Sequence, residues 1–185
     1  MGVKNELFVI ILDYFRTYLP SMHKCSRHTI RTYQVVLEQF LDYIKTKNNI
    51  KLYDVTFSML NKNSLSDYLE YVEVSRHCTV STRNHRRACI LSFMKYAANY
   101  NIEASVIFEE FKTVIKARET KRPVKYMSQL AVQSIIKQPN CSTPKGMRDM
   151  FLLIFLYQTG ARVQEVVDVR LCDIRLDKFA TVTLH

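Results

Sequence analysis

Apolar side chains recur three and four positions apart in successive stretches between residues 6 and 116. This spacing puts them on one face of an α-helix, so it predicts several helices that share one core. The chain has 185 residues but only three glycines and four prolines, and many short strands joined by tight turns would need more of both. We therefore expect a mainly α domain, with helices at 6–19, 26–47, 79–100 and 103–116 and a further one that begins after Ser64.

Local signals set the ends of these helices. Pro20 should stop the first helix, and Ser26 and Ser64 can cap the second and third. In the helix expected at 79–100, the core face should consist of Ala88, Leu91, Phe93, Met94 and Ala97.

The same helix carries cations in its first turns, at Arg83, Arg86 and Arg87. Cations at a helix N-terminus oppose the helix dipole, and arginines three and four apart repel each other. A strong external anion would compensate for this arrangement. One interpretation is that the helix approaches DNA, with Asn84 and the arginines contacting phosphates or base edges; the other is a solvated basic face.

The overall charge points to the same kind of partner. Lysine and arginine number 27 against 17 acidic residues, a net charge of +10, and the pI is about 9.4. Such an excess is typical of a protein that meets a polyanion, either nucleic acid or an anionic membrane surface. A basic protein with no such partner is the alternative.

A second organised segment covers residues 145–176. An apolar run, Met150–Tyr157, is followed by Thr159-Gly160, and glycine accepts the left-handed backbone that ends helices. Arg162 then stands one helical turn from Glu165. A planar, permanently charged guanidinium at such a position can bind a phosphate; a surface ion pair with Glu165 is the alternative. Residues 181–184 alternate and are β-branched, which predicts a strand.

Residues 148–174 resemble the first active-site segment of the tyrosine recombinases, the phage-integrase family. The resemblance is carried by Arg148-Asp149, the apolar run, Thr159–Arg162, Glu165, Leu171 and Asp173-Ile174. It implies that Arg162 is the first catalytic arginine and that Glu165 supports it. Leu171, Ile174 and Tyr157 are expected in the core.

The resemblance extends to the first part of the chain, where residues 79–96 are similar to the last long helix of the family's core-binding domain. It implies a helical core-binding (SAM-like) domain at 1–116, a basic linker at 117–125 and a truncated α+β catalytic domain at 126–185. Thr82, Arg83, Asn84, Arg86 and Arg87 would contact double-stranded DNA. The linker would lie along the duplex, and its phosphate contacts would be Lys121, Arg122 and Lys125; a flexible solubilising linker is the alternative.

The resemblance also implies a chemistry. In the family a tyrosine hydroxyl attacks a backbone phosphate and forms a covalent phosphotyrosine, with no metal and no cofactor. No position here matches the family's further active-site lysine, its His/Lys-x-x-Arg motif or its nucleophilic tyrosine. We therefore expect a chain that binds DNA without cutting it, from a parent that is tetrameric on DNA. A non-catalytic DNA-binding regulator and a helical protein-interaction module remain alternatives.

The cysteines and the N-terminus suggest no other function. The five cysteines contain no CxxC pair, and His23, Cys25 and His28 lack a second ligand pair at zinc spacing, so no metal site is expected. We find no signal peptide or apolar span, and expect a cytoplasmic protein that does not enter a membrane.

Overall fold

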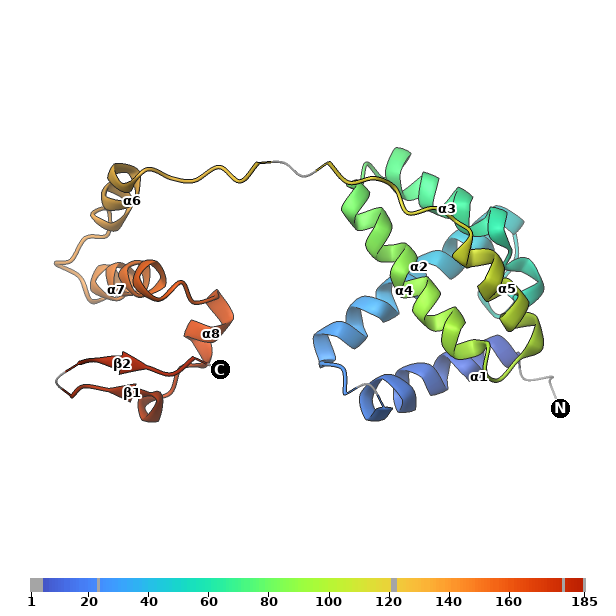
Figure 1. Ribbon diagram of the computed structural model, residues 1–185, viewed down its shortest axis with the longest axis horizontal. Coiled ribbons are helices and arrows are strands. Elements are labelled where there is room, and N and C mark those ends of the chain that lie inside the picture. The colour runs from blue at the N-terminus through green and yellow to red at the C-terminus, as the bar shows by residue number, and fades with distance from the viewer. Residues whose placement is uncertain (1–4, 23, 121–122, 178, 185) are drawn as a thin grey trace. The chain divides into compact units, whose positions relative to one another are not determined.

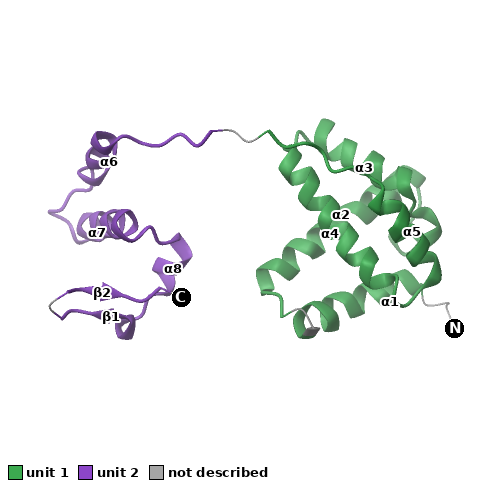
Figure 2. Ribbon diagram, in the orientation of Figure 1, with its two compact units in different colours: residues 1–121 green, residues 122–185 purple. Residues whose placement is uncertain are grey.

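The computed structural model describes residues 5–22, 24–120, 123–177 and 179–184. The chain separates into two compact units, residues 1–121 and 122–185 (Figure 2). The division lies inside the basic segment expected as a linker. Each unit is therefore described by itself.

The first unit is helical, as the apolar periodicity predicts. Its α-helices are α1 (Glu6–Asp13), α2 (Arg27–Asn48), α3 (Lys62–Val74), α4 (Val80–Ala97) and α5 (Ile102–Lys112) (Figure 1). Two short 3-10 turns, Leu52–Asp54 and Phe57–Met59, connect α2 to α3. Helix α4 packs against α2, α3 and α5, so it is the central element of this unit.

The core of the first unit is built from all five helices. In α4 the buried residues are Cys89, Ile90, Phe93, Met94, Tyr96 and Ala97. Three of the five residues expected on the core face, Phe93, Met94 and Ala97, are buried as predicted, whereas Ala88 is exposed and Leu91 is half-buried. Since the helix contacts three others, its buried stripe is wider than a single-sided pattern predicts.

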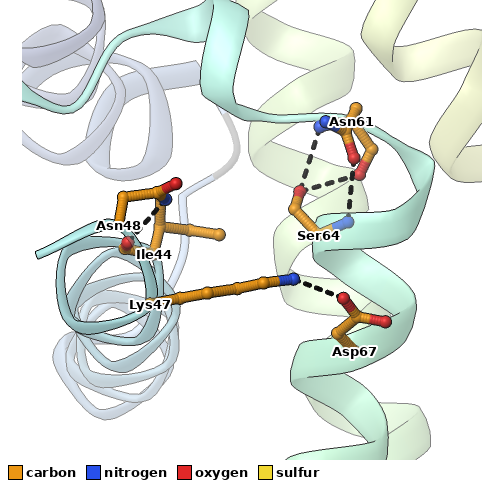
Figure 3. Close-up of polar contacts among 6 residues, drawn as sticks. All are labelled: Ile44, Lys47, Asn48, Asn61, Ser64 and Asp67. Atoms are coloured by element: carbon orange, nitrogen blue, oxygen red, sulfur yellow. Dashed lines mark hydrogen bonds and ion pairs between the residues drawn. The ribbon is translucent and has the colours of Figure 1, made fainter.

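Side-chain caps fix where the helices begin. Ser26, Thr79 and Asn101 each accept a hydrogen bond from a backbone N–H in the first turn of α2, α4 and α5. At α3 the cap is Asn61 and not the expected Ser64. The Asn61 side chain accepts from the Ser64 N–H at 2.9 Å, and Ser64 Oγ accepts from the Asn61 N–H at 3.0 Å (Figure 3). Ser64 therefore serves as the reciprocal partner in a capping box.

The first helix does not stop at Pro20. After α1 the chain continues as a π-helical segment, Tyr14–Met22, which contains Pro20. The aromatic rings of Tyr14 and Tyr18 lie against Tyr96 of α4, with ring centroids 5.2 and 4.3 Å from it. This tertiary packing favours continued helical structure despite Pro20, which would interrupt a regular α-helix.

The second unit contains α6 (Gln129–Ile136), α7 (Pro144–Thr159), α8 (Val163–Asp168), a 3-10 turn (Leu171–Asp173) and two strands. Strands β1 (Ile174–Arg175) and β2 (Thr181–Val182) are antiparallel, with Ile174 opposite Val182 and Arg175 opposite Thr181. The strand expected at 181–184 is thus present but shorter, and β1 was not expected.

Side chains expected in the core of this unit are exposed. Leu171 is 90% exposed, Tyr157 55% and Ile174 36%. All the buried apolar side chains of the described residues lie between Leu7 and Val114, in the first unit. Three helices and a hairpin of two-residue strands offer too little surface to cover these side chains, so the predicted core positions were wrong for the described unit.

Candidate nucleic-acid interface

Arg162 lies in the short break between α7 and α8. Gly160 ends α7 with φ at 64°, a left-handed conformation that glycine adopts without strain. Arg162 follows in extended backbone as the N-cap residue of α8, and its side chain is 85% exposed. The guanidinium is therefore open to solvent, as a phosphate-binding group must be.

Glu165 holds Arg162 from the first turn of α8. Its Oε2 accepts a hydrogen bond from the Arg162 backbone N–H at 2.8 Å, and its Oε1 accepts one from a terminal guanidinium nitrogen at 2.7 Å. These backbone and side-chain hydrogen bonds lower the pKa of Glu165, so its carboxylate stays charged at neutral pH. A guanidinium has five N–H donors, so most of those on Arg162 can still bind an anion.

Arg83 and Arg87, expected at the DNA interface, contact the protein itself. The Nε atom of Arg83 lies 3.2 Å from the Glu73 carboxylate, and its side chain is only 15% exposed. Arg87 donates to the carbonyls of Val114 at 2.7 Å and Lys112 at 3.2 Å, at the end of α5. Burial, with a smaller effect of the charge on Arg83, lowers the pKa of Arg87. We expected an external anion to balance the charges of these arginines. Instead, a carboxylate and two backbone carbonyls of the protein bind Arg83 and Arg87.

Asn84 is buried between these arginines, with 6% of its surface exposed. Its amide nitrogen donates to the Ala117 carbonyl and to a Glu119 carboxylate oxygen, both at 2.9 Å. Its amide oxygen accepts from the Ala117 N–H at 3.0 Å. Both of its donors are used, so in this structure Asn84 fastens residues 117–119 to α4 and presents no amide group to a base edge.

Thr82 and Arg86, in contrast, face a groove between α4 and α2. The cavity there has a volume of about 300 Å³, and its lining includes Arg31 and Thr32 from α2 and Thr82, His85 and Arg86 from α4. No carboxylate belongs to this lining in the described part of the chain. The structure thus brings two arginines, a histidine and two hydroxyl groups together. We call this region the α2–α4 groove.

The contribution of α2 to this groove was missed in the sequence. Arg31 is exposed and one helical turn from Arg27, close to the start of α2. This is the same arrangement of cations in the first turns of a helix that singled out α4. Applied to both helices, that signal would have found Arg31 and its neighbour Thr32.

The basic linker is only partly described. Lys125 is exposed and lies outside any helix or strand, whereas Lys121 and Arg122 fall outside the described residues. Ala117 and Glu119 are bound to Asn84, so the beginning of the expected linker belongs to the first unit.

Among the described residues, no three His, Cys, Asp or Glu side chains are grouped so as to hold a metal ion. His23 of the weak His23–Cys25–His28 candidate lies outside the described residues. None of the helices in the described ranges has the length and apolar character needed to cross a membrane.

Comparison with known proteins places this geometry in context. The sequence profile of the family described as phage integrase, N-terminal SAM-like domain, matches residues 11–103. A putative integrase/recombinase, y4rD of Sinorhizobium fredii, is 27% identical over 91% of this chain and 60% of its own length. Tyrosine recombinase XerC of Herpetosiphon aurantiacus is 27% identical over 89% of the chain and 51% of its own length. Tyrosine recombinase XerD of Listeria monocytogenes is 25% identical over 90% of the chain and 53% of its own length. The chain thus spans between half and three fifths of the length of these relatives.

Replacing Asn84 with alanine should loosen the segment after α5. The substitution removes the hydrogen bonds from the Asn84 side chain to the N–H and C=O of the half-buried Ala117, and a typical hydrogen bond contributes about 0.5–1.5 kcal/mol. We expect faster hydrogen exchange at residues 113–120 and lower stability of the first unit toward urea. The matched control is Asn99→Ala, because Asn99 is exposed and its side chain donates to the neighbouring Lys95 carbonyl at a longer distance, 3.4 Å. Equal effects of the two substitutions would contradict the role given to Asn84.

Replacing Arg162 with alanine should raise the pKa of Glu165 part of the way to its ordinary value. The backbone N–H still donates to the carboxylate, so only the side-chain contribution is lost. A carboxyl whose pKa is lower in the folded state stabilises the fold above its unfolded pKa. That contribution disappears as the pH falls through the folded pKa. NMR titration of the Glu165 carboxyl measures this, with Arg170→Ala as the control; an unchanged pKa in Arg162→Ala would contradict the ion pair.

Proposed function

This chain belongs to the tyrosine recombinase, or phage-integrase, family, and on that premise we propose that its first unit binds double-stranded DNA through the α2–α4 groove. The observation that carries the proposal is the lining of the groove. Arg31, His85 and Arg86 meet there from two helices, and no carboxylate of the described residues balances them. A phosphate backbone supplies the missing negative charge.

The groove offers both kinds of contact that DNA recognition needs. Arg31 is exposed and can pair with a phosphate, and such contacts set the position of a protein on the duplex. The Thr82 hydroxyl lies in the same lining and can hydrogen-bond to a base edge in the major groove, which is wide enough to admit an α-helix. The other three candidates act indirectly in this proposal, because they fix the position of α4. These are Arg83, Asn84 and Arg87, which bind Glu73, Ala117 and Val114.

The linker extends the contact surface. Lys121, Arg122 and Lys125 would pair with phosphates beyond the groove, as the family resemblance implies. Each phosphate contact releases counterions from the DNA, so affinity should fall steeply with salt.

Arg162 is the group of the second unit that we assign to the reacting phosphate. Negative charge builds on the non-bridging oxygens when a nucleophile attacks phosphorus, and fixed donors directed at that charge stabilise the transition state. Glu165 binds one guanidinium nitrogen and the backbone N–H, and so orients the remaining donors of Arg162. Lysine would not reproduce this planar set of donors.

The complete recombinase reaction needs more than this chain supplies. We infer that the parent protein cleaves and rejoins DNA through a phosphotyrosine intermediate, as a tetramer on DNA. No tyrosine of this chain follows Tyr157, and no tyrosine matches the position of the family's nucleophile. In our proposal residues 1–185 bind DNA and contribute one catalytic arginine, but do not form the covalent link.

Two other functions predict different measurements. A regulator derived from a shortened recombinase would show salt-dependent DNA binding, and it would differ from the parent enzyme in forming no covalent adduct on a suicide substrate. A helical protein-interaction module would show no salt-dependent DNA binding at all.

Arg31→Gln should weaken DNA binding in a salt-dependent way. The loss of one phosphate contact should reduce the slope of log affinity against log salt by about 1. Fluorescence anisotropy of a labelled duplex at several salt concentrations measures this. Lys95→Gln is the control, because Lys95 is an exposed cation near the other end of α4. If the two variants lose the same affinity, or neither loses any, the groove is not the binding surface.

A suicide DNA substrate tests the chemical part of the proposal. This chain should form no covalent adduct with a nicked duplex that traps phosphotyrosine, since it holds no matching nucleophile. The readout is a denaturing gel of protein incubated with end-labelled DNA. A covalent band that resists denaturation would show that a tyrosine of this chain attacks DNA.

A further inference from the structure

A second cavity of the first unit lies between α2 and α3 and has a volume of about 460 Å³. That volume is within the range of roughly 300–1,000 Å³ typical of small-molecule sites. Its walls include Tyr43 and Lys47 of α2, Tyr68 and Tyr71 of α3, and Arg76 and Arg86. It shares only Gln39 and Arg86 with the lining of the α2–α4 groove, so it is a neighbouring and separate space.

The charges around this cavity are not balanced. Lys47 reaches across from α2 to the Asp67 carboxylate on α3, so this cation is already paired (Figure 3). Arg86 donates to the neutral Tyr68 hydroxyl at 3.0 Å. Arg76 is exposed, and within the described ranges no carboxylate lies within ion-pair distance of Arg76 or Arg86. Two guanidinium groups therefore line the cavity without acidic partners, which is the chemistry that binds a phosphate.

Aromatic rings lie beside these cations. The Tyr43 ring is 5.2 Å from the Tyr71 ring, with an angle of 33° between their planes, and 5.5 Å from the Tyr68 ring. Tyr71 is 36% exposed, so part of its side chain remains open to a ligand. Nucleic-acid bases stack on such side chains whatever their sequence, since every base has a π-face.

A carboxylate and a hydroxyl complete the lining. Asp42 and Thr46 are exposed on α2. The ion pair between Asp42 and Lys45 is long, with 3.6 Å between the carboxylate oxygen and the ammonium nitrogen. The side-chain oxygens of Asp42 and Thr46 can accept hydrogen bonds from the exocyclic amino group of a base. The cavity thus combines donors for an anion, a surface for stacking and acceptors for an amine.

We propose that this cavity binds a single nucleotide, with its phosphate at Arg76 and Arg86 and its base against Tyr43 and Tyr71. The nucleotide is a ligand here and takes no part in strand transfer. It is either an unpaired nucleotide of a bound DNA strand or a free nucleotide, because both present the same phosphate and base. The proposal stands on the lining of the cavity itself and does not require duplex DNA to bind in the α2–α4 groove.

Titration of the whole chain with deoxyadenosine monophosphate tests the site. Isothermal titration calorimetry should show saturable binding, and Tyr71→Leu and Arg76→Gln should each weaken it by about ten-fold or more, since stacking and a charge-assisted phosphate bond are each large enough for that change. Inorganic phosphate should bind more weakly and should not respond to Tyr71→Leu. The controls are Tyr53→Leu, an exposed tyrosine outside the cavity lining, and Lys95→Gln.

The two sources of the nucleotide are distinguished with DNA. If the source is a DNA strand, a duplex with one extrahelical nucleotide should bind more tightly than the perfect duplex, and Tyr71→Leu should abolish the difference. If the source is a free nucleotide, the two duplexes should bind equally while deoxyadenosine monophosphate still binds.

Two results would overturn the proposal: no binding of the nucleotide to the folded chain, or binding that Tyr71→Leu and Arg76→Gln leave unchanged. Arg31→Gln separates this site from the DNA-binding groove. It should weaken duplex binding and leave nucleotide binding intact, so either site can fail without the other.

Discussion

The packing of α4 against α2, α3 and α5 is the interaction on which the rest of the first unit depends. The C-terminal half of α4 supplies apolar contacts through Ile90, Phe93 and Met94. Its N-terminal half is held by polar side chains instead, since Asn84 and Arg87 donate hydrogen bonds to backbone carbonyls just after α5. Once one face of α4 is fixed in this way, Thr82 and Arg86 are directed toward α2. The helix is thus both the centre of the core and one wall of the proposed DNA site.

Much of the local structure was predictable because its causes are local. Ser26 and Thr79 cap helices through hydrogen bonds within one turn, and Gly160 ends α7 through its own backbone freedom. The exceptions depend on partners far along the chain. Arg83 and Arg87 look like a DNA-contacting pair in the sequence, but their acceptors are carbonyls or carboxylates 10 or more positions away. No spacing rule shows which distant carbonyl a guanidinium will reach.

Two of the proposed phosphate-binding groups, Arg162 and Arg31, differ in how they are held. Arg162 is oriented by two hydrogen bonds between its residue and Glu165, as suits a donor that must meet developing charge in a fixed position. Arg31 is an exposed side chain on the surface of α2, where adaptability to a sequence-independent backbone is sufficient. Arg162 is recognisable from a local sequence motif, whereas the position of Arg31 beside Arg86 depends on how α2 packs against α4, which no local motif encodes.

The uneven distribution of buried apolar surface has a consequence for handling the protein. The second unit leaves Leu130 76%, Phe151 59% and Val163 70% exposed, and none of its large apolar side chains in the described ranges is buried, whereas the first unit buries a core that includes Tyr14, Phe40 and Phe93. Exposed apolar side chains in such numbers favour self-association. A preparation of the second unit alone is therefore prone to aggregate, and residues 1–121 are the better starting material for concentrated samples.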